Sequence, residues 1–309
     1  MNNVPSNRGM DSAVFLVIGS CMSLQFAASL AVQIFPHAGA WGVSALRLLI
    51  AGLILCLFTR PRIRQWNAMQ WRRVIVFGLS LGLMNSFFYA SIAHIPLGVA
   101  VTIEFLGPLL LAAVLSRRPV DLACVLAAAI GLGLLGWDAL GGESQLAPIG
   151  IALALIAGVF WVCYILASAK VGEVIPGQGG LAVVFLIGGL AAVPAGFQGA
   201  LVIVGDPHLL LLALGTALLG SLVPYSLELM ALRRLPPGVF GILLSLEPVF
   251  AALFGWLLLS QDLNAWQLAA IALVISASIG TTLSGRARRP TAPREQLAAE
   301  PAASSCIRS

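Results

Sequence analysis

The sequence is poor in charged residues, and this shortage excludes most classes of water-soluble protein. It has 17 basic and 12 acidic residues among 309, so charged residues make up 9% of the chain, against roughly 25% in soluble domains. A cytosolic enzyme, a nucleic-acid-binding module and a disordered chain all need more polar surface than this. Apolar residues reach 60%, which predicts a polytopic membrane protein whose solvent is the lipid bilayer.

The sequence also lacks the motifs of common pumps and enzymes. No G-x-x-x-x-G-K-[ST] sequence is present, which excludes an ATP-driven pump within this chain. The three histidines have no H-E-x-x-H spacing, so we expect no metal site and no cofactor. The sequence Gly131-x-Gly133-x-x-Gly136 has a dinucleotide-binding spelling, but no strand precedes it. We therefore interpret it as a helix-packing face.

Ten apolar segments are each long enough to cross a bilayer, which takes about 20 residues. They cover approximately residues 11–33, 40–58, 73–93, 97–115, 120–138, 147–168, 179–197, 209–231, 238–259 and 265–284. Because these segments use about two-thirds of the chain, the links must be short and leave no room for a soluble domain. The sequence predicts an all-α protein of ten transmembrane helices.

Basic residues alternate between successive links, and this alternation predicts the topology. All but one of the 17 lie at the termini or in even-numbered links: Arg8, Arg60, Arg62, Arg64, Arg72, Arg73, Arg117, Arg118, Lys170, Arg233, Arg234, Arg286, Arg288, Arg289, Arg294 and Arg308. The odd-numbered links contain no Lys or Arg. Positive loops mark the cytoplasmic face, so both ends of the chain are predicted to be cytoplasmic.

The two halves of the chain repeat each other at an offset of 140 residues. Pro96–Val99 matches Pro236–Val239, and Pro108 matches Pro248. Each unit holds five spans, an odd number, so the second copy must enter the membrane from the opposite side. Inverted repeats of this kind are common in transporters, whose substrate site lies between the halves. The expected domains are an N-terminus 1–10, repeats 11–140 and 147–284, and a disordered tail 285–309.

Four charged residues lie inside predicted spans. Arg47 and Glu104 are each about 10 Å below the outer surface at 1.5 Å per residue, so they are candidates for an ion pair, either structural or functional. Glu247 lies near the midplane with no basic partner left, which suits it to carry a proton or bind an ammonium group. Glu228 lies about one turn from the cytoplasmic end, where we expect it to reach Arg233 at the interface.

Prolines and polar side chains accompany these charges. Pro108 and Pro248 cannot donate the helical hydrogen bond, so each is expected to open its helix beside an acid, and Pro194 and Pro224 to kink two other spans. Such backbone is tolerated where protein or water satisfies it. Five polar residues either line a cavity there or join neighbouring helices by hydrogen bonds: Gln25, Asn85, Tyr89, Tyr164 and Tyr225.

Several stretches resemble a known transporter family. They are Val43–Leu48, Met84–Tyr89, Ile95–Ala100, Glu104–Pro108, Ser116–Asp121, Pro224–Glu228 and Ser245–Pro248. With the two five-span halves, they are similar to the EamA-type branch of the drug/metabolite transporter superfamily, and within it to the threonine/homoserine exporters of bacterial inner membranes. The resemblance runs from about Ser12 to Ser284.

This resemblance implies a secondary exporter of small amino acids in the cytoplasmic membrane, driven by protons and working by alternating access. The charged residues inside the spans lead to a compatible hypothesis, in which Glu247 or Glu104 engages the substrate ammonium, Arg47 holds its carboxylate, and protonation of a Glu couples transport to the gradient. Three alternatives remain open: an exporter of drugs, purines or a broader range of amino acids on the same fold, an intramembrane enzyme, and a passive channel. The enzyme is disfavoured because no nucleophile–base pair or metal constellation occurs.

Overall fold

A computed structural model describes residues 7–116, 119–140, 146–172, 174–175, 179–232, 234, 240 and 243–286. Every regular element within these residues is a helix, which confirms the all-α class for this part of the chain. Five helices there are long and apolar enough to cross a membrane: Ala13–Thr59, Ala68–Ile92, Pro148–Gly172, Gly179–Gly205 and Pro207–Glu228. The remaining apolar helices are shorter. A polytopic membrane protein is therefore supported, and the count of ten spans stays a prediction.

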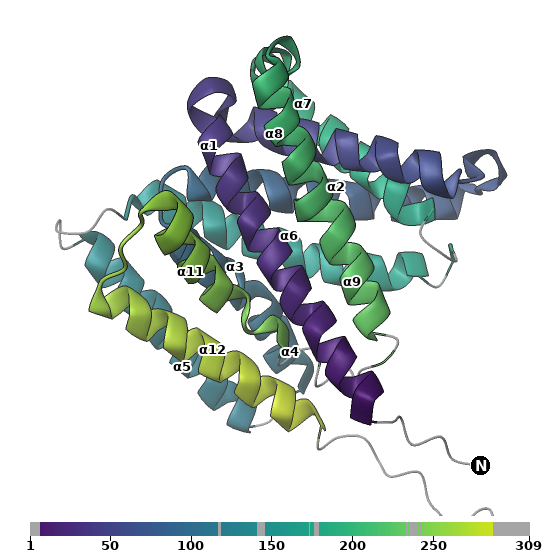
Figure 1. Cartoon of the computed structure of the whole chain (residues 1–309). Helices are drawn as coiled ribbons and strands as arrows, with labels where there is room; N and C mark the ends of the chain where they lie inside the picture. The colour runs from purple at the N-terminus through teal and green to yellow at the C-terminus, as the bar shows by residue number, and fades with distance from the viewer. Residues whose placement is uncertain are drawn as a thin grey trace, which may run out of the picture.

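The first two predicted spans form one long element, α1 (Asn7–Thr59), which is divided at Gly39. Gly39 has φ 66° and ψ 160°, a backbone conformation that side-chain-bearing residues rarely adopt. The two parts of α1 therefore run in different directions (Figure 1). After η1 (Ile63–Gln65), Asn67 caps α2 (Ala68–Ile92) through reciprocal hydrogen bonds of 2.9 Å with Gln70.

The other helices follow the predicted segments to within several residues. They are α3 (Leu97–Glu104), α4 (Leu106–Ser116), α5 (Pro119–Leu140), α6 (Pro148–Gly172), α7 (Gly179–Gly205), α8 (Pro207–Ala217), the π-helical η2 (Leu218–Leu222), α9 (Val223–Leu232), α11 (Glu247–Leu259) and α12 (Ala265–Arg286). Some sequence-based predictions lie outside the described residues: residues 1–6, Arg117, Arg118, Arg233, the repeat motif Pro236–Val239 and the tail 287–309.

Glycines let the long helices approach each other closely. Gly42 of α1 lies against Gly199 of α7, and Gly52 against Leu186, so these two helices run antiparallel. Gly82 of α2 meets the backbone of α7 in the same way. Because lipid offers no hydrophobic drive to bring helices together, close packing of small residues has to supply the attraction.

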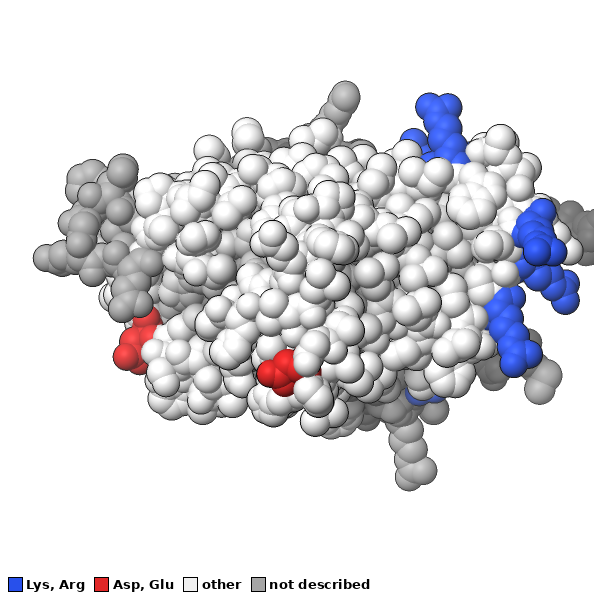
Figure 2. All heavy atoms as spheres, turned by 90° about the horizontal axis from the view of Figure 1, so that it is seen from above, with Lys and Arg blue, Asp and Glu red and all other residues white. Residues whose placement is uncertain are grey.

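Charged side chains are scarce on the outer surface and are separated by sign. Figure 2 shows Lys and Arg gathered at one end of the visible face, Asp and Glu away from them, and uncharged residues between. The exposed basic residues of the described chain are Arg60, Arg62, Arg64, Arg72, Arg234 and Lys170, all in links predicted to be cytoplasmic. The exposed Asp206 and Asp262 lie in links predicted to be outside. This separation is the one that the positive-inside rule leads us to expect.

Candidate functional site

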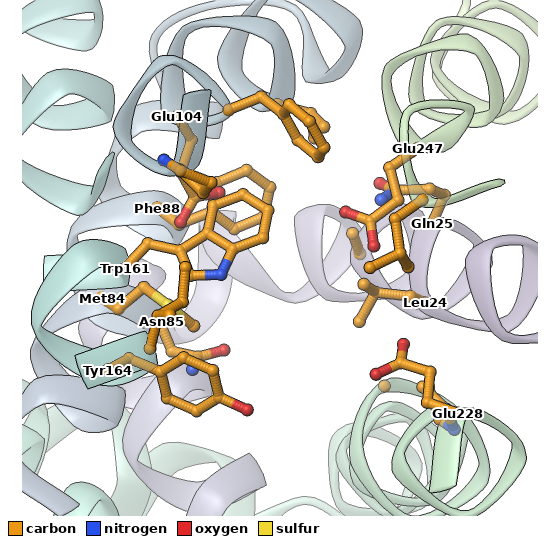
Figure 3. Close-up of a pocket in the computed structure, with 18 of the residues that line it drawn as sticks. Leu24, Gln25, Met84, Asn85, Phe88, Glu104, Trp161, Tyr164, Glu228 and Glu247 are labelled. Atoms are coloured by element: carbon orange, nitrogen blue, oxygen red, sulfur yellow. The ribbon is translucent and has the colours of Figure 1, made fainter. Parts of the chain in front are cut away.

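A cavity of about 440 Å³ lies among α1, α2, α3, α6, α9 and α11 (Figure 3). This volume is within the roughly 300–1,000 Å³ of small-molecule sites. All eight polar residues predicted from the sequence line it: Gln25, Arg47, Asn85, Tyr89, Glu104, Tyr164, Tyr225 and Glu247. The described residues contain no group of three His, Cys, Asp or Glu placed to hold a metal ion. The tertiary structure thus gathers these eight residues around one space.

Arg47 is buried and is held by neutral groups. Its Nη1 donates to the carbonyl of Gly220 at 3.0 Å, and its Nη2 donates to Oδ1 of Asn85. The guanidinium lies 4.8 Å from the centre of the Tyr89 ring, in a cation–π contact. The ion pair expected between Arg47 and Glu104 is not formed. The reason is that the Gly220 carbonyl and the Asn85 amide oxygen already accept hydrogen bonds from the guanidinium of Arg47.

The carbonyl that receives Arg47 is available because of a proline. Pro224 has no N–H to donate to Gly220, four residues earlier, and the helix widens into the π turn η2 just before it. The neighbouring Leu219 carbonyl is satisfied by α1, since Ser23 donates to it at 2.7 Å. The irregularity expected at Pro224 is confirmed. The Gly220 carbonyl, which Pro224 leaves without a helical donor, positions Arg47.

Pro108 comes shortly after Glu104 in the chain. A single turn residue, Phe105, separates α3 from α4 while keeping helical dihedrals (φ −63°, ψ −18°), and Pro108 cannot donate to the Glu104 carbonyl. Gly158 of α6 faces that carbonyl so closely that a Cβ there would lie 2.9 Å from the oxygen. The one-residue interruption between α3 and α4 lies beside this acid, and the kink at Pro108 stays a prediction.

Pro248 has the matching place beside Glu247. The helix α11 begins at Glu247, with Pro248 in its first turn and turn residues immediately before it. The predicted opening beside this acid stays a prediction, because residues 238, 239, 241 and 242 lie outside the described residues.

Glu104 and Glu247 enter the cavity from opposite walls (Figure 3). Each side chain is 7% exposed, and neither forms a hydrogen bond or ion pair with a residue that the structure describes. Glu104 lies within electrostatic range of both Arg47 and Glu247. Buried polar groups are nearly always paired in folded proteins, so two unpaired carboxyl groups around one space indicate a site that receives a ligand or a proton.

Glu228 corrects the sequence interpretation. We expected it to reach the interface beside Arg233, but it lines the cavity and accepts a hydrogen bond from Ser20 Oγ at 2.7 Å (Figure 3). Its spacing of three residues from Tyr225 puts both on one helix face, but only the packing of α9 against Ser20 of α1 turns Glu228 toward the cavity. Tyr225 and Tyr164 line the same cavity.

An apolar wall was missed by the sequence interpretation. Met84, Phe88 and Trp161 line the cavity on the side of Glu104 (Figure 3). Trp161 is held in place by the ring of Phe105, edge to face at 5.3 Å. Apolar residues in an apolar helix carry no signal that distinguishes a cavity wall from a lipid contact, so only the assembled structure identifies them.

A helical bundle with an apolar exterior and an internal cavity containing unpaired charges is typical of membrane transporters. Residues 148–283 match the EamA-like transporter family. Two relatives carry the name threonine/homoserine exporter RhtA, one from Escherichia coli strain K12 and one from Salmonella typhimurium strain LT2. Each is 41% identical over 276 residues, which cover 88% of this chain and 92% of the relative.

A solved crystal structure of a protein 19% identical to this chain aligns with a TM-score of 0.59. The alignment covers 90% of this chain and 99% of that one, so the two share a fold. The chain belongs to the EamA-like transporter family. Membership confirms the expectation of a membrane transporter rather than an enzyme.

Proposed function

We propose that this protein exports small amino acids of the threonine and homoserine kind across a bacterial cytoplasmic membrane, driven by protons. The observation that carries the proposal is the cavity with an interior cation and unpaired carboxyl groups. A zwitterionic amino acid brings one carboxylate and one ammonium group, which complement these charges. The names of the relatives support the substrate class.

In this proposal Arg47 binds the substrate carboxylate. A guanidinium has five N–H donors, and two of them serve Gly220 and Asn85. The Nε of Arg47 is buried and has no partner in the part of the chain that the structure describes, so donors remain for a carboxylate. The ammonium group is bound by Glu104 or Glu247, and the carboxyl group that is not engaged carries the coupled proton.

We further propose that residues 11–140 and 147–284 are inverted five-helix repeats. Support comes from the packing of segments that the 140-residue offset relates. Leu49 of α1 packs against Gly189 of α7, where a Cβ would lie 2.8 Å from Leu49 Cγ. The two residue numbers differ by 140, so these residues hold equivalent positions in the two halves. Gly131 of α5 lies against Ala270 of α12. Their residue numbers differ by 139, so Ala270 is the neighbour of the residue equivalent to Gly131. Related helices that meet at equivalent positions are expected around a two-fold axis in the membrane plane.

Transport then follows from rocking of the two halves around the cavity. The cavity opens alternately to either side of the membrane, with both chain ends in the cytoplasm. The breaks at Pro108 and Pro248 lie beside the two acids, where α3 and α11 form part of the wall. Movement there changes the surroundings of the acids, which is the condition for coupling a proton to the substrate.

The test is efflux of labelled threonine and homoserine from membrane vesicles or cells with an imposed pH gradient. Glu247→Gln is expected to lose efflux itself if Glu247 binds the ammonium group, and to lose the dependence of efflux on the gradient if Glu247 carries the proton, because the amide can do neither. Asp262→Asn is the matched control, since Asp262 is exposed in a link away from the cavity. Wild-type efflux with unchanged pH dependence in Glu247→Gln would remove Glu247 from coupling. No efflux of either amino acid from the wild type would refute the proposed function.

A further inference from the structure

Gln25 of α1 has a buried hydrogen-bond acceptor that receives no donor from the described part of the chain. Its side chain is 2% exposed and lines the cavity, and its Oε1 has no partner among the described residues. In Figure 3 it lies beside Glu247, on the wall opposite Glu104. Buried side-chain oxygens without a partner are rare because the lost hydration is not replaced. This oxygen therefore indicates a donor that arrives with the ligand.

The other amide of the cavity is already satisfied. Asn85 accepts from Arg47 through Oδ1 and donates to the Leu81 carbonyl at 2.9 Å through Nδ2. Asn85 thus serves to hold Arg47. Of the two amides, Gln25 is the one whose oxygen remains available to a ligand.

The charged groups of an amino acid have better partners than Gln25. Arg47 and Glu104 lie within electrostatic range of each other, as a pair must to bind a carboxylate and an ammonium group attached to the same carbon. Hydrogen bonds between ionised groups are stronger than those to neutral ones, so the zwitterion is expected to bind this pair. The neutral oxygen of Gln25 then suits a neutral donor, which in a small amino acid is a side-chain hydroxyl.

We infer that Gln25 accepts a hydrogen bond from the side-chain hydroxyl of the substrate and thereby selects hydroxylated amino acids. The inference rests on the proposed function and adds the residue that determines its specificity. Leu24 and Ala28 line the cavity on the same helix, so the oxygen stands in a largely apolar stretch that accommodates the carbon atoms. An amino acid of the same size without the hydroxyl leaves this oxygen unpaired and binds more weakly.

The test compares threonine with valine, which replaces the hydroxyl by a methyl group of similar size. The wild type is expected to prefer threonine in proteoliposomes. Gln25→Met keeps the length of the side chain and removes the acceptor, so the preference should fall by about tenfold or more, through weaker threonine transport. Gln33→Met is the matched control, because Gln33 is exposed on the same helix and its replacement should leave the ratio unchanged.

The outcomes separate the inference from the function on which it rests. A wild type that transports no threonine or homoserine refutes the proposed function. A wild type that transports threonine and valine equally, or a Gln25→Met variant that keeps the wild-type ratio, overturns the inference alone.

If Gln25→Met is inactive, binding of both amino acids to the purified full-length variant is measured by thermal shift. Equal binding of the two supports the inference, whereas a retained threonine preference or no binding of either overturns it. Gln25→Leu replaces Gln25→Met if the latter does not accumulate.

Discussion

Arg47 links three helical segments, so its replacement should show how much the buried network contributes to stability. Arg47→Met fills a similar length but leaves the Gly220 carbonyl and the Asn85 amide oxygen without donors. An unsatisfied buried acceptor costs roughly 1–3 kcal/mol, so we expect a loss of about 2–6 kcal/mol in the free energy of unfolding. Arg47→Lys can reach one of the two acceptors and should lose about half as much.

The measurement is a double-mutant cycle on purified protein, with unfolding followed in mixed detergent micelles. Asn85→Leu removes one of the acceptors that Arg47→Met would leave unpaired. The combined variant should therefore be less destabilised than the sum of the single variants, by about 0.5–3 kcal/mol. Additive effects, or an Arg47→Met variant within about 0.5 kcal/mol of the wild type, would refute the account of Arg47 as the centre of a buried hydrogen-bond network.

Two further predictions concern the backbone. A Cβ added by Gly82→Ala would collide with the backbone of Gly188, so we expect the free energy of unfolding to fall by about 1–3 kcal/mol. The control is Gly133→Ala, because nothing lies within 4 Å of a Cβ there. In thermal unfolding this control should be neutral or slightly stabilising. Pro108→Ala restores an N–H that can donate to the Glu104 carbonyl and so stiffens the break between α3 and α4. We expect this variant to unfold at a higher temperature and to export threonine more slowly. An unchanged efflux rate would show that the break does not take part in transport.

The helices and their breaks were predictable from the sequence because both depend on local chemistry. Long apolar segments and the missing N–H of Pro108 and Pro224 each have a consequence that does not depend on distant residues. The glycine-rich face predicted to pack against a helix likewise places Gly131 against Ala270 of α12. The candidate polar residues were found in the same way, because any polar side chain inside a span has to find a partner or a cavity.

The partners of those residues were decided by the tertiary structure alone. Depth along a helix placed Arg47 and Glu104 at one level, but rotation about the helix axes determined that Arg47 meets Gly220 and Asn85 instead. The direction of Glu228 depended likewise on how α9 packs against Ser20 of α1. Sequence fixes the order and depth of groups along each helix, whereas hydrogen bonds are made between helices, and their length and angle are set only when the helices have packed.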